Sequence, residues 1–209
     1  MQKCAFEKRI RLALFIHSLS VIGFQIILMR ILSINQWDHF ANMIIGIAML
    51  GFGVSGSLLA VFKEKIMTHA RLLMPLLMIL SAICMLGSYR LTQNQALAFD
   101  TFLVFSSFKE LSKLVLFVGL YFLPFFSASL AIGIIYVENV QEIGKLYFAN
   151  LLGSGIGGAL GLSLLYLFFP QNALLAIALL PVIASLFLLD HQYQKFLKAA
   201  YLLFFVFMI

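Results

Sequence analysis

Residues 147–169 read YFANLLGSGIGGALGLSLLYLFF, an apolar stretch without Asp, Glu, Lys or Arg. A helix needs about 20 predominantly apolar residues to cross the hydrocarbon core of a bilayer, and this stretch is long enough. It therefore predicts a transmembrane helix, and it sets the pattern for which the rest of the chain can be searched.

Five further apolar runs have a similar length, and they lie near residues 12–34, 40–62, 71–89, 111–137 and 172–190. Together the runs predict an all-α, polytopic transmembrane helix bundle with six complete spans, in a single domain of residues 1–209. The composition agrees, because 63% of the 209 residues are hydrophobic and only 11% are charged. A soluble fold of this size cannot bury so much apolar surface.

Two apolar segments are too short to cross a bilayer. Residues 199–209 (AAYLLFFVFMI) reach only about 16 Å as a helix, so they predict a partial seventh span. We expect this segment to be either an interfacial tail or the start of a longer span in a protein of which the chain is a fragment. Residues 96–108 contain Asp100 and predict an amphipathic or re-entrant segment in a long external loop.

The basic residues predict the orientation. They gather in the N-terminal leader and in alternate loops, whereas the remaining loops hold only Arg90, Lys109 and Lys113. The leader resembles that of a signal peptide, but no small-residue cleavage site follows, so we expect an uncleaved first helix. The positive-inside rule then predicts a cytoplasmic N-terminus in the cell's inner (plasma) membrane. Because the Lys and Arg residues are scattered singly, they indicate a lipid bilayer as partner and no nucleic acid.

Small residues predict where helices pack closely. Gly153, Gly157 and Gly161 recur every four residues, and a shorter set in the second span contains Gly51, Gly53 and Gly56. Helix backbones approach closely at such positions, so we expect the second and fifth spans to form the tightly packed centre. Both sets also match the letters of a dinucleotide-binding motif, G-x-G-x-x-G. They lack the preceding strand and exposed helix start of that motif, so we interpret them as packing residues.

Five polar residues within or beside the spans are candidates for an intramembrane site: His17, Gln25, Arg30, Asn42 and Asn150. An arginine at the centre of a span costs about 2.5–3.5 kcal/mol on insertion scales. Arg30 lies near the outer end of its span, so it either reaches the interface or pairs with a polar group across the bundle. We expect His17 and the two asparagines to form hydrogen bonds between helices, with a proton relay as the alternative for His17.

The sequence predicts no catalytic, cofactor-binding or metal site. Cys4 and Cys84 have neither metal-site spacing nor the company of a disulfide framework, so we expect free thiols. No Asp or Glu lies deep within a span, which argues against a carrier of cations or protons. Residues 40–42 and 148–150 both read Phe-Ala-Asn at the start of a span. Because these two spans would run in opposite directions, the match suggests an inverted repeat of three and three helices, as in many transporters.

Three runs resemble one protein family: FQIILMRILS at 24–33, LGFGVSG at 50–56 and LYFANLLGSGIG at 146–157. They are similar to the multi-span membrane region that precedes the catalytic domain in membrane-bound spermidine synthase-like proteins, of the fused major-facilitator and spermidine synthase type. The resemblance covers most of the chain from about residue 12 to residue 170. The family often has Glu at the position of Gln25 and Asp at that of Asn150, whereas this chain has an amide at both.

The resemblance implies an integral membrane module that anchors an aminopropyltransferase-like domain not present in this chain. Any aminopropyltransferase activity, and any polyamine substrate, would belong to that missing soluble domain. Two alternatives remain open, a small-solute transporter with an inverted 3+3 repeat and a non-catalytic membrane assembly subunit that binds another membrane protein.

Overall fold

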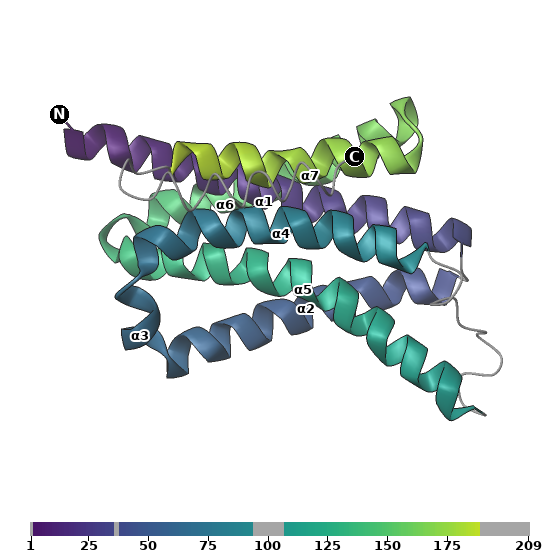
Figure 1. Cartoon of the computed structure of the whole chain (residues 1–209). Helices are drawn as coiled ribbons and strands as arrows, with labels where there is room; N and C mark the ends of the chain where they lie inside the picture. Colours follow the sequence, from purple (N-terminus) through teal and green to yellow (C-terminus); the bar gives the residue numbers. More distant parts are fainter. Residues whose placement is uncertain (1, 36–37, 94–106, 189–209) are drawn as a thin grey trace.

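A computed structural model of the chain describes residues 2–35, 38–93 and 107–188. Within these residues the chain is helical and contains no strand (Figure 1). The elements are α1 Gln2–Asn35, α2 Asp38–Val61, α3 Lys63–Met67, α4 Ala70–Thr92, α5 Phe108–Glu138, the 3₁₀ turn η2 Val140–Glu142, α6 Ile143–Leu167 and α7 Pro170–Phe187. The predicted all-α bundle is therefore confirmed, while the partial span at 199–209 and nearly all of the segment 96–108 lie outside the described residues.

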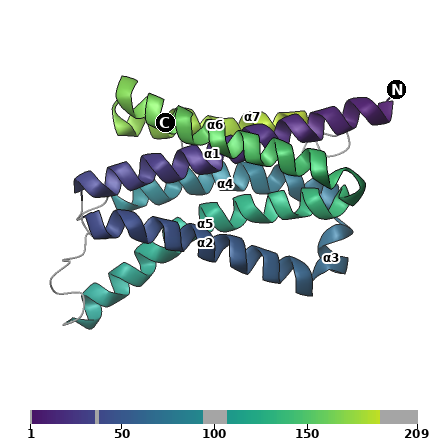
Figure 2. The ribbon, with the colours of Figure 1, turned by 180° about the vertical axis from the view of Figure 1, so that it is seen from behind.

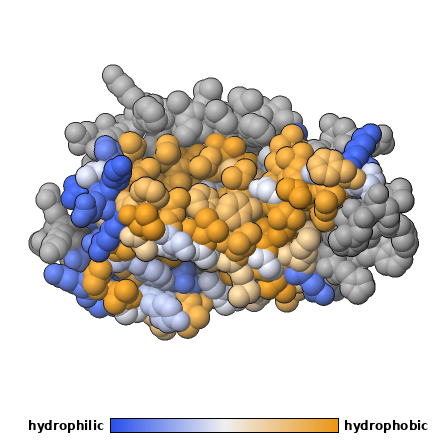
Figure 3. All heavy atoms as spheres, turned by 90° about the horizontal axis from the view of Figure 1, so that it is seen from below, coloured by the Kyte–Doolittle hydropathy of each residue, from blue (hydrophilic) through white to orange (hydrophobic). Residues whose placement is uncertain are grey.

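Six helices are long and apolar enough to cross a membrane: α1, α2, α4, α5, α6 and α7. On the face seen in Figure 3, hydrophobic side chains cover the middle of the molecule, and hydrophilic side chains gather toward its two ends. This distribution matches the hydrocarbon core and the two interfaces of a bilayer. The chain is thus a multi-pass membrane protein.

The helices extend slightly beyond several of the predicted spans. α6 begins at Ile143 rather than 147, where an ion pair between Lys145 and Glu142 (2.7 Å) lies in the first turn. α5 begins at Phe108 rather than 111. The short helix α3 occupies part of what the sequence indicates as a loop between two spans. Polar residues at the membrane interface can extend a helix beyond its apolar run, so the run alone does not predict where the helix begins.

The centre of the bundle is α1, which packs against α6, α7, α2 and, to a smaller extent, α5. The prediction that the second and fifth spans, α2 and α6, form the centre is wrong. Only 17% of the most apolar stretch of α6 is buried, against 61% in α1. α6 lies along one side of α1 (Figure 2), so its small residues serve one close contact rather than a position among many neighbours.

A second group of contacts surrounds α5, which packs against α2 and α4, and α4 in turn packs against α7. α5 changes direction part of the way along its length (Figures 1 and 2). Pro124 lies within this helix and is buried. A proline removes one backbone hydrogen bond and crowds the preceding turn, so it accounts for a bend in this region.

The buried apolar side chains form two clusters, one in each half of the bundle. Along each of α1, α2, α4 and α5, buried polar residues lie between the part that belongs to one cluster and the part that belongs to the other. We call this set the polar layer; together with a serine of α7, it consists of His17, Ser18, Ser20, Ser55, Ser81, Ser129 and Ser185. Polar groups are costly in a membrane interior, so the layer marks a level at which side chains need hydrogen-bond partners.

Candidate functional site

The site is built from two pairs of helices that each run parallel. In the first pair, α6 meets α1 at three levels spaced four residues apart: Gly153 at Phe15, Gly157 at Leu19 and Gly161 at Gly23. A β-carbon at Gly157 would lie 2.8 Å from the Cα of Leu19, and one at Gly161 would lie 3.2 Å from the Cα of Gly23. Only glycine permits such a close approach of backbones.

The second pair, α2 with α5, has the same spacing. Gly51 packs against Phe125, Ser55 against Ser129, and the Leu59 side chain against Gly133. A β-carbon at Gly51 would lie 2.9 Å from the Cβ of Phe125.

Gly53 and Gly56, by contrast, are exposed, and a β-carbon at either would meet nothing within 4 Å. The prediction that Gly53 and Gly56 pack against another helix is therefore wrong for the part of the chain that the structure describes. α2 turns only one side toward α5, and these two glycines lie off that side.

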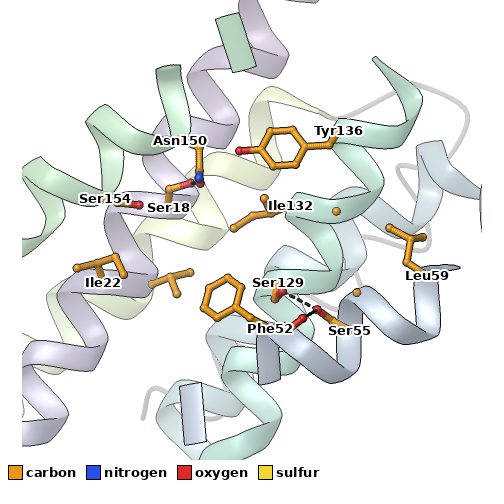
Figure 4. A pocket seen from close by; sticks show the side chains of 13 residues that line it. Ser18, Ile22, Phe52, Ser55, Leu59, Ser129, Ile132, Tyr136, Asn150 and Ser154 are labelled. Carbon is orange, nitrogen blue, oxygen red and sulfur yellow. Dashed lines mark hydrogen bonds between the residues drawn. The ribbon is translucent and has the colours of Figure 1, made fainter. Parts of the chain in front are cut away.

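A cavity of about 250 Å³ lies between the two pairs (Figure 4). All four helices contribute to its wall. The polar side chains among the lining residues are Ser18, Ser55, Ser129, Tyr136, Asn150 and Ser154. Apolar side chains such as Val21, Phe52 and Ile132 make up much of the rest of the wall, and no Lys, Arg, His, Asp or Glu lines it, so the wall is mixed in polarity and carries no charge.

Two hydrogen bonds lie in the wall, one within each helix pair. The Ser18 hydroxyl donates to Asn150 Oδ1 (2.5 Å), and the Ser55 and Ser129 hydroxyls lie 2.5 Å apart. Ser18 also lies 2.8 Å from the carbonyl oxygen of Leu14, and Ser55 lies 2.9 Å from that of Phe52. Each helix pair therefore presents one hydrogen-bonded pair of polar side chains to the cavity, near the polar layer.

The Tyr136 hydroxyl is buried and has no hydrogen-bond partner within the described part of the chain. Figure 4 shows that it points toward the Ser18 and Asn150 side chains. A buried hydroxyl without a partner is costly, so an unpaired one at a cavity indicates a place where a further polar group can bind.

His17 is fully buried beside this site but does not line the cavity. Its Nε2 lies 3.3 Å from the carbonyl oxygen of Ala128, which links α1 to α5. If Nε2 donates to that carbonyl, Nδ1 is left as an acceptor, and Nδ1 has no partner among the residues that the structure describes. The partner of His17 is thus a backbone group of another helix.

The other predicted site residues lie elsewhere. Arg30 is exposed near the end of α1, beside a groove that the α6–α7 connection helps to form, a position that suits an arginine at the membrane interface. Gln25 is half-buried outside the cavity, and Asn42 is exposed near the start of α2. Of the five candidates, the structure places only Asn150 in the cavity wall and His17 next to it.

Sequence reasoning on single polar residues missed Ser55, Ser129 and Tyr136 as members of one site. The available signal was the set of hydroxyl side chains at similar depth in otherwise apolar helices.

The described residues also contain no group of three or more His, Cys, Asp or Glu that could hold a metal ion. Cys84 is partly buried in α4 and is a free cysteine. No protein-family model, curated protein or solved structure matches the chain.

Proposed function

We propose that this protein carries a small, uncharged polar solute across the membrane and that the cavity between the helix pairs is its binding site. One observation supports this most directly. Six hydroxyl and amide side chains gather in the wall of one cavity within the apolar spans, where polar groups are costly unless they have a use.

We infer further that the bundle is an inverted repeat in which α1, α2 and α4 correspond to α5, α6 and α7. If the two sets are equivalent, the contact of α1 with α6 corresponds to that of α5 with α2, and the contact of α1 with α7 corresponds to that of α5 with α4. All four contacts are present. The packing of α1 on α2 has no comparable counterpart between α5 and α6. In transporters built this way, the substrate site lies near the membrane midplane between the repeats; here residues of both repeats line a cavity that reaches from the level of Ser18 and Ile22 to that of Leu59 and Tyr136.

The wall of the cavity favours a particular class of solute. Its hydroxyl groups and the Asn150 amide offer donors and acceptors, while the absence of charge in the lining disfavours an ion. The volume of about 250 Å³ is at or below the lower end of the range of about 300–1,000 Å³ for drug-sized ligands. A small polyol or amide fits this description better than a sugar chain or a peptide.

Uptake by proteoliposomes tests the proposal. The purified protein should give saturable uptake of at least one radiolabelled small polyol or amide, above the level of empty vesicles. Asn150→Leu should lower the uptake by about tenfold, because it removes an acceptor worth about 1–1.5 kcal/mol. Asn172→Leu is the matched control, since Asn172 is exposed at the start of α7 and outside the cavity.

Uptake no greater than in empty vesicles across the panel would refute the carrier proposal. Equal loss in both asparagine variants would refute the assignment of the cavity as the site. A variant that melts normally but does not transport separates a lost binding group from a lost fold, so each variant is also followed by circular dichroism on heating.

We also propose that the protein lies in the plasma membrane with a cytoplasmic N-terminus. The exposed basic residues at the end of the bundle that holds the N-terminus of α1 support this, since Lys63, Lys65, Arg71 and Lys145 join those of α1 there. In a variant without Cys4 and Cys84, a membrane-impermeant maleimide should label Lys109→Cys in intact cells and Lys65→Cys only after lysis. The reverse labelling pattern would contradict the orientation.

A second candidate function is the membrane module of a spermidine synthase-like protein, as the resemblance implies. The three runs that resemble the family lie on α1, α2 and α6, and α1 packs against both of the others. On this proposal the protein should purify in a fixed ratio with a soluble aminopropyltransferase-like protein or domain. Purification with a membrane partner alone would instead indicate an assembly subunit.

A further inference from the structure

A groove of about 590 Å³ lies between α1 and α6, away from the cavity described above. Three basic side chains line it, Lys8 and Arg11 from α1 and Lys145 from the first turn of α6. They belong to the end of the bundle that holds the N-terminus of α1, where the apolar band gives way to hydrophilic residues. The groove thus begins at the level of lipid headgroups.

The rest of the groove is apolar. Leu12 and Phe15 line it from α1, and Phe148 and Leu152 line it from α6. The last two are among the exposed large hydrophobic side chains, at 65% and 45% of their possible surface. From Lys8 to Phe15 the helix rises by about 10 Å, which covers roughly two thirds of one leaflet of hydrocarbon.

The charges in and around the groove do not cancel. Glu142 binds Lys145 at 2.7 Å, and Glu7 lies one turn before Arg11, so two acidic groups accompany the three basic lining residues and the exposed Arg9. The Arg11 Nε lies 3.4 Å from a backbone carbonyl oxygen, that of Glu7, which leaves the positive charge of the guanidinium in place. The headgroup end of the groove is therefore positively charged.

We propose that this groove is a binding site for a phospholipid with an anionic headgroup. The three basic residues bind the phosphate, and one acyl chain lies between Phe15 and Phe148. Basic pockets between transmembrane helices recognise anionic lipids in this way. A free phosphate could use the charges but not the apolar groove that continues from them, so the combined chemistry favours the lipid. The site does not depend on solute transport.

Native mass spectrometry of the purified full chain, titrated with phosphatidylglycerol or with phosphatidylcholine of the same acyl chains, tests the proposal. Phosphatidylglycerol should bind at least tenfold more tightly. Each basic residue near an anionic lipid contributes about fivefold in affinity, so the triple variant Lys8→Ala, Arg11→Ala, Lys145→Ala should bind phosphatidylglycerol roughly a hundredfold more weakly.

The matched control removes the same charge at the same end of the molecule, with Lys63→Ala, Lys65→Ala and Arg71→Ala. These three residues are exposed and do not line the groove, so this control should bind phosphatidylglycerol within about twofold of the wild type. Ala149→Trp, which fills the groove without changing charge, should weaken phosphatidylglycerol binding as well.

Several results would overturn the proposal. Equal binding of the two lipids would mean that no headgroup is selected, and equal losses in the two triple variants would mean that only the overall charge matters. Displacement of the lipid by inorganic phosphate at millimolar concentration would identify a site for a free anion. Normal lipid binding by Ala149→Trp would show that the acyl chain does not lie in the groove. Circular dichroism of each variant separates these outcomes from unfolding.

Discussion

Replacing Gly157 with alanine should push α6 away from α1. The added methyl group would lie 2.8 Å from the Cα of Leu19 and 2.9 Å from its carbonyl carbon, and both atoms belong to backbone that no rotamer change can move. Overpacking of this kind costs about 1–3 kcal/mol. Alanine also favours a helix over glycine by about 0.8–1.0 kcal/mol, which partly hides the cost.

Gly155→Ala removes this ambiguity, because Gly155 lies on the same helix, is exposed, and has nothing within 4 Å of an added β-carbon. The helix preference is the same in both variants, so the difference between them isolates the packing cost. We expect Gly157→Ala to be less stable than Gly155→Ala by about 2–3 kcal/mol, near the upper end of the overpacking range.

Thermal unfolding in detergent, followed by far-ultraviolet circular dichroism, measures this difference. For a chain of this size, 1 kcal/mol corresponds to about 2–4 °C, so the two melting temperatures should differ by about 4–12 °C. If both variants melt together within the error of the measurement, α6 does not rest on the backbone of α1 at this level. The description of the parallel pair would then be wrong.

Three other changes have defined outcomes. A double-mutant cycle of Ser55→Ala and Ser129→Ala should give a coupling energy of about 0.6–1.7 kcal/mol in the same melting assay, as interhelical hydrogen bonds do in membranes, and a value near zero would deny the bond. His17→Leu, compared with wild type by chemical denaturation in mixed micelles, should cost less than about 2 kcal/mol, because one bond to the Ala128 carbonyl is lost while an unpaired ring nitrogen disappears. Gly53→Ala should leave the melting temperature unchanged or slightly raised, and a fall of several degrees would contradict the open space found beside Gly53.

The spans could be predicted because the bilayer imposes one strong requirement on each of them. A run such as 147–169 has to be apolar along its whole length, so composition alone reveals the helix that the structure contains as α6. The arrangement of the helices carries no comparable signal. Glycines suggested a central α6, but a small residue shows only that something approaches closely, not how many neighbours surround the helix.

The cavity shows a similar limit. Asn150 and His17 stood out as costly residues in apolar runs, and the structure places them in or beside the site. Ser55, Ser129 and Tyr136 are common in membrane helices, so none of them is conspicuous by itself. They form a site only because α2 packs against α5 in a register that places Ser55 beside Ser129. That register depends on long-range packing.

The contact between α1 and α6 also raises the question of register. Its levels repeat every four residues, so a slide of α6 by one helical turn, about 5.4 Å, would bring Ala149 to Phe15 and Gly153 to Leu19. Gly153 would fit at Leu19 after this movement, but the β-carbon of Ala149 would meet the backbone carbonyl of Phe15, where the present alignment places a glycine. The spacing of the glycines therefore disfavours the shifted alignment at one of the three levels.

The polar pair selects the present alignment as well. Sliding in that direction replaces Asn150 with Leu146 opposite Ser18 and breaks their hydrogen bond, while sliding the other way brings Leu165 against Gly23, where a β-carbon scarcely fits. The serine–asparagine bond and the spacing of the glycines thus select the same alignment of the two helices.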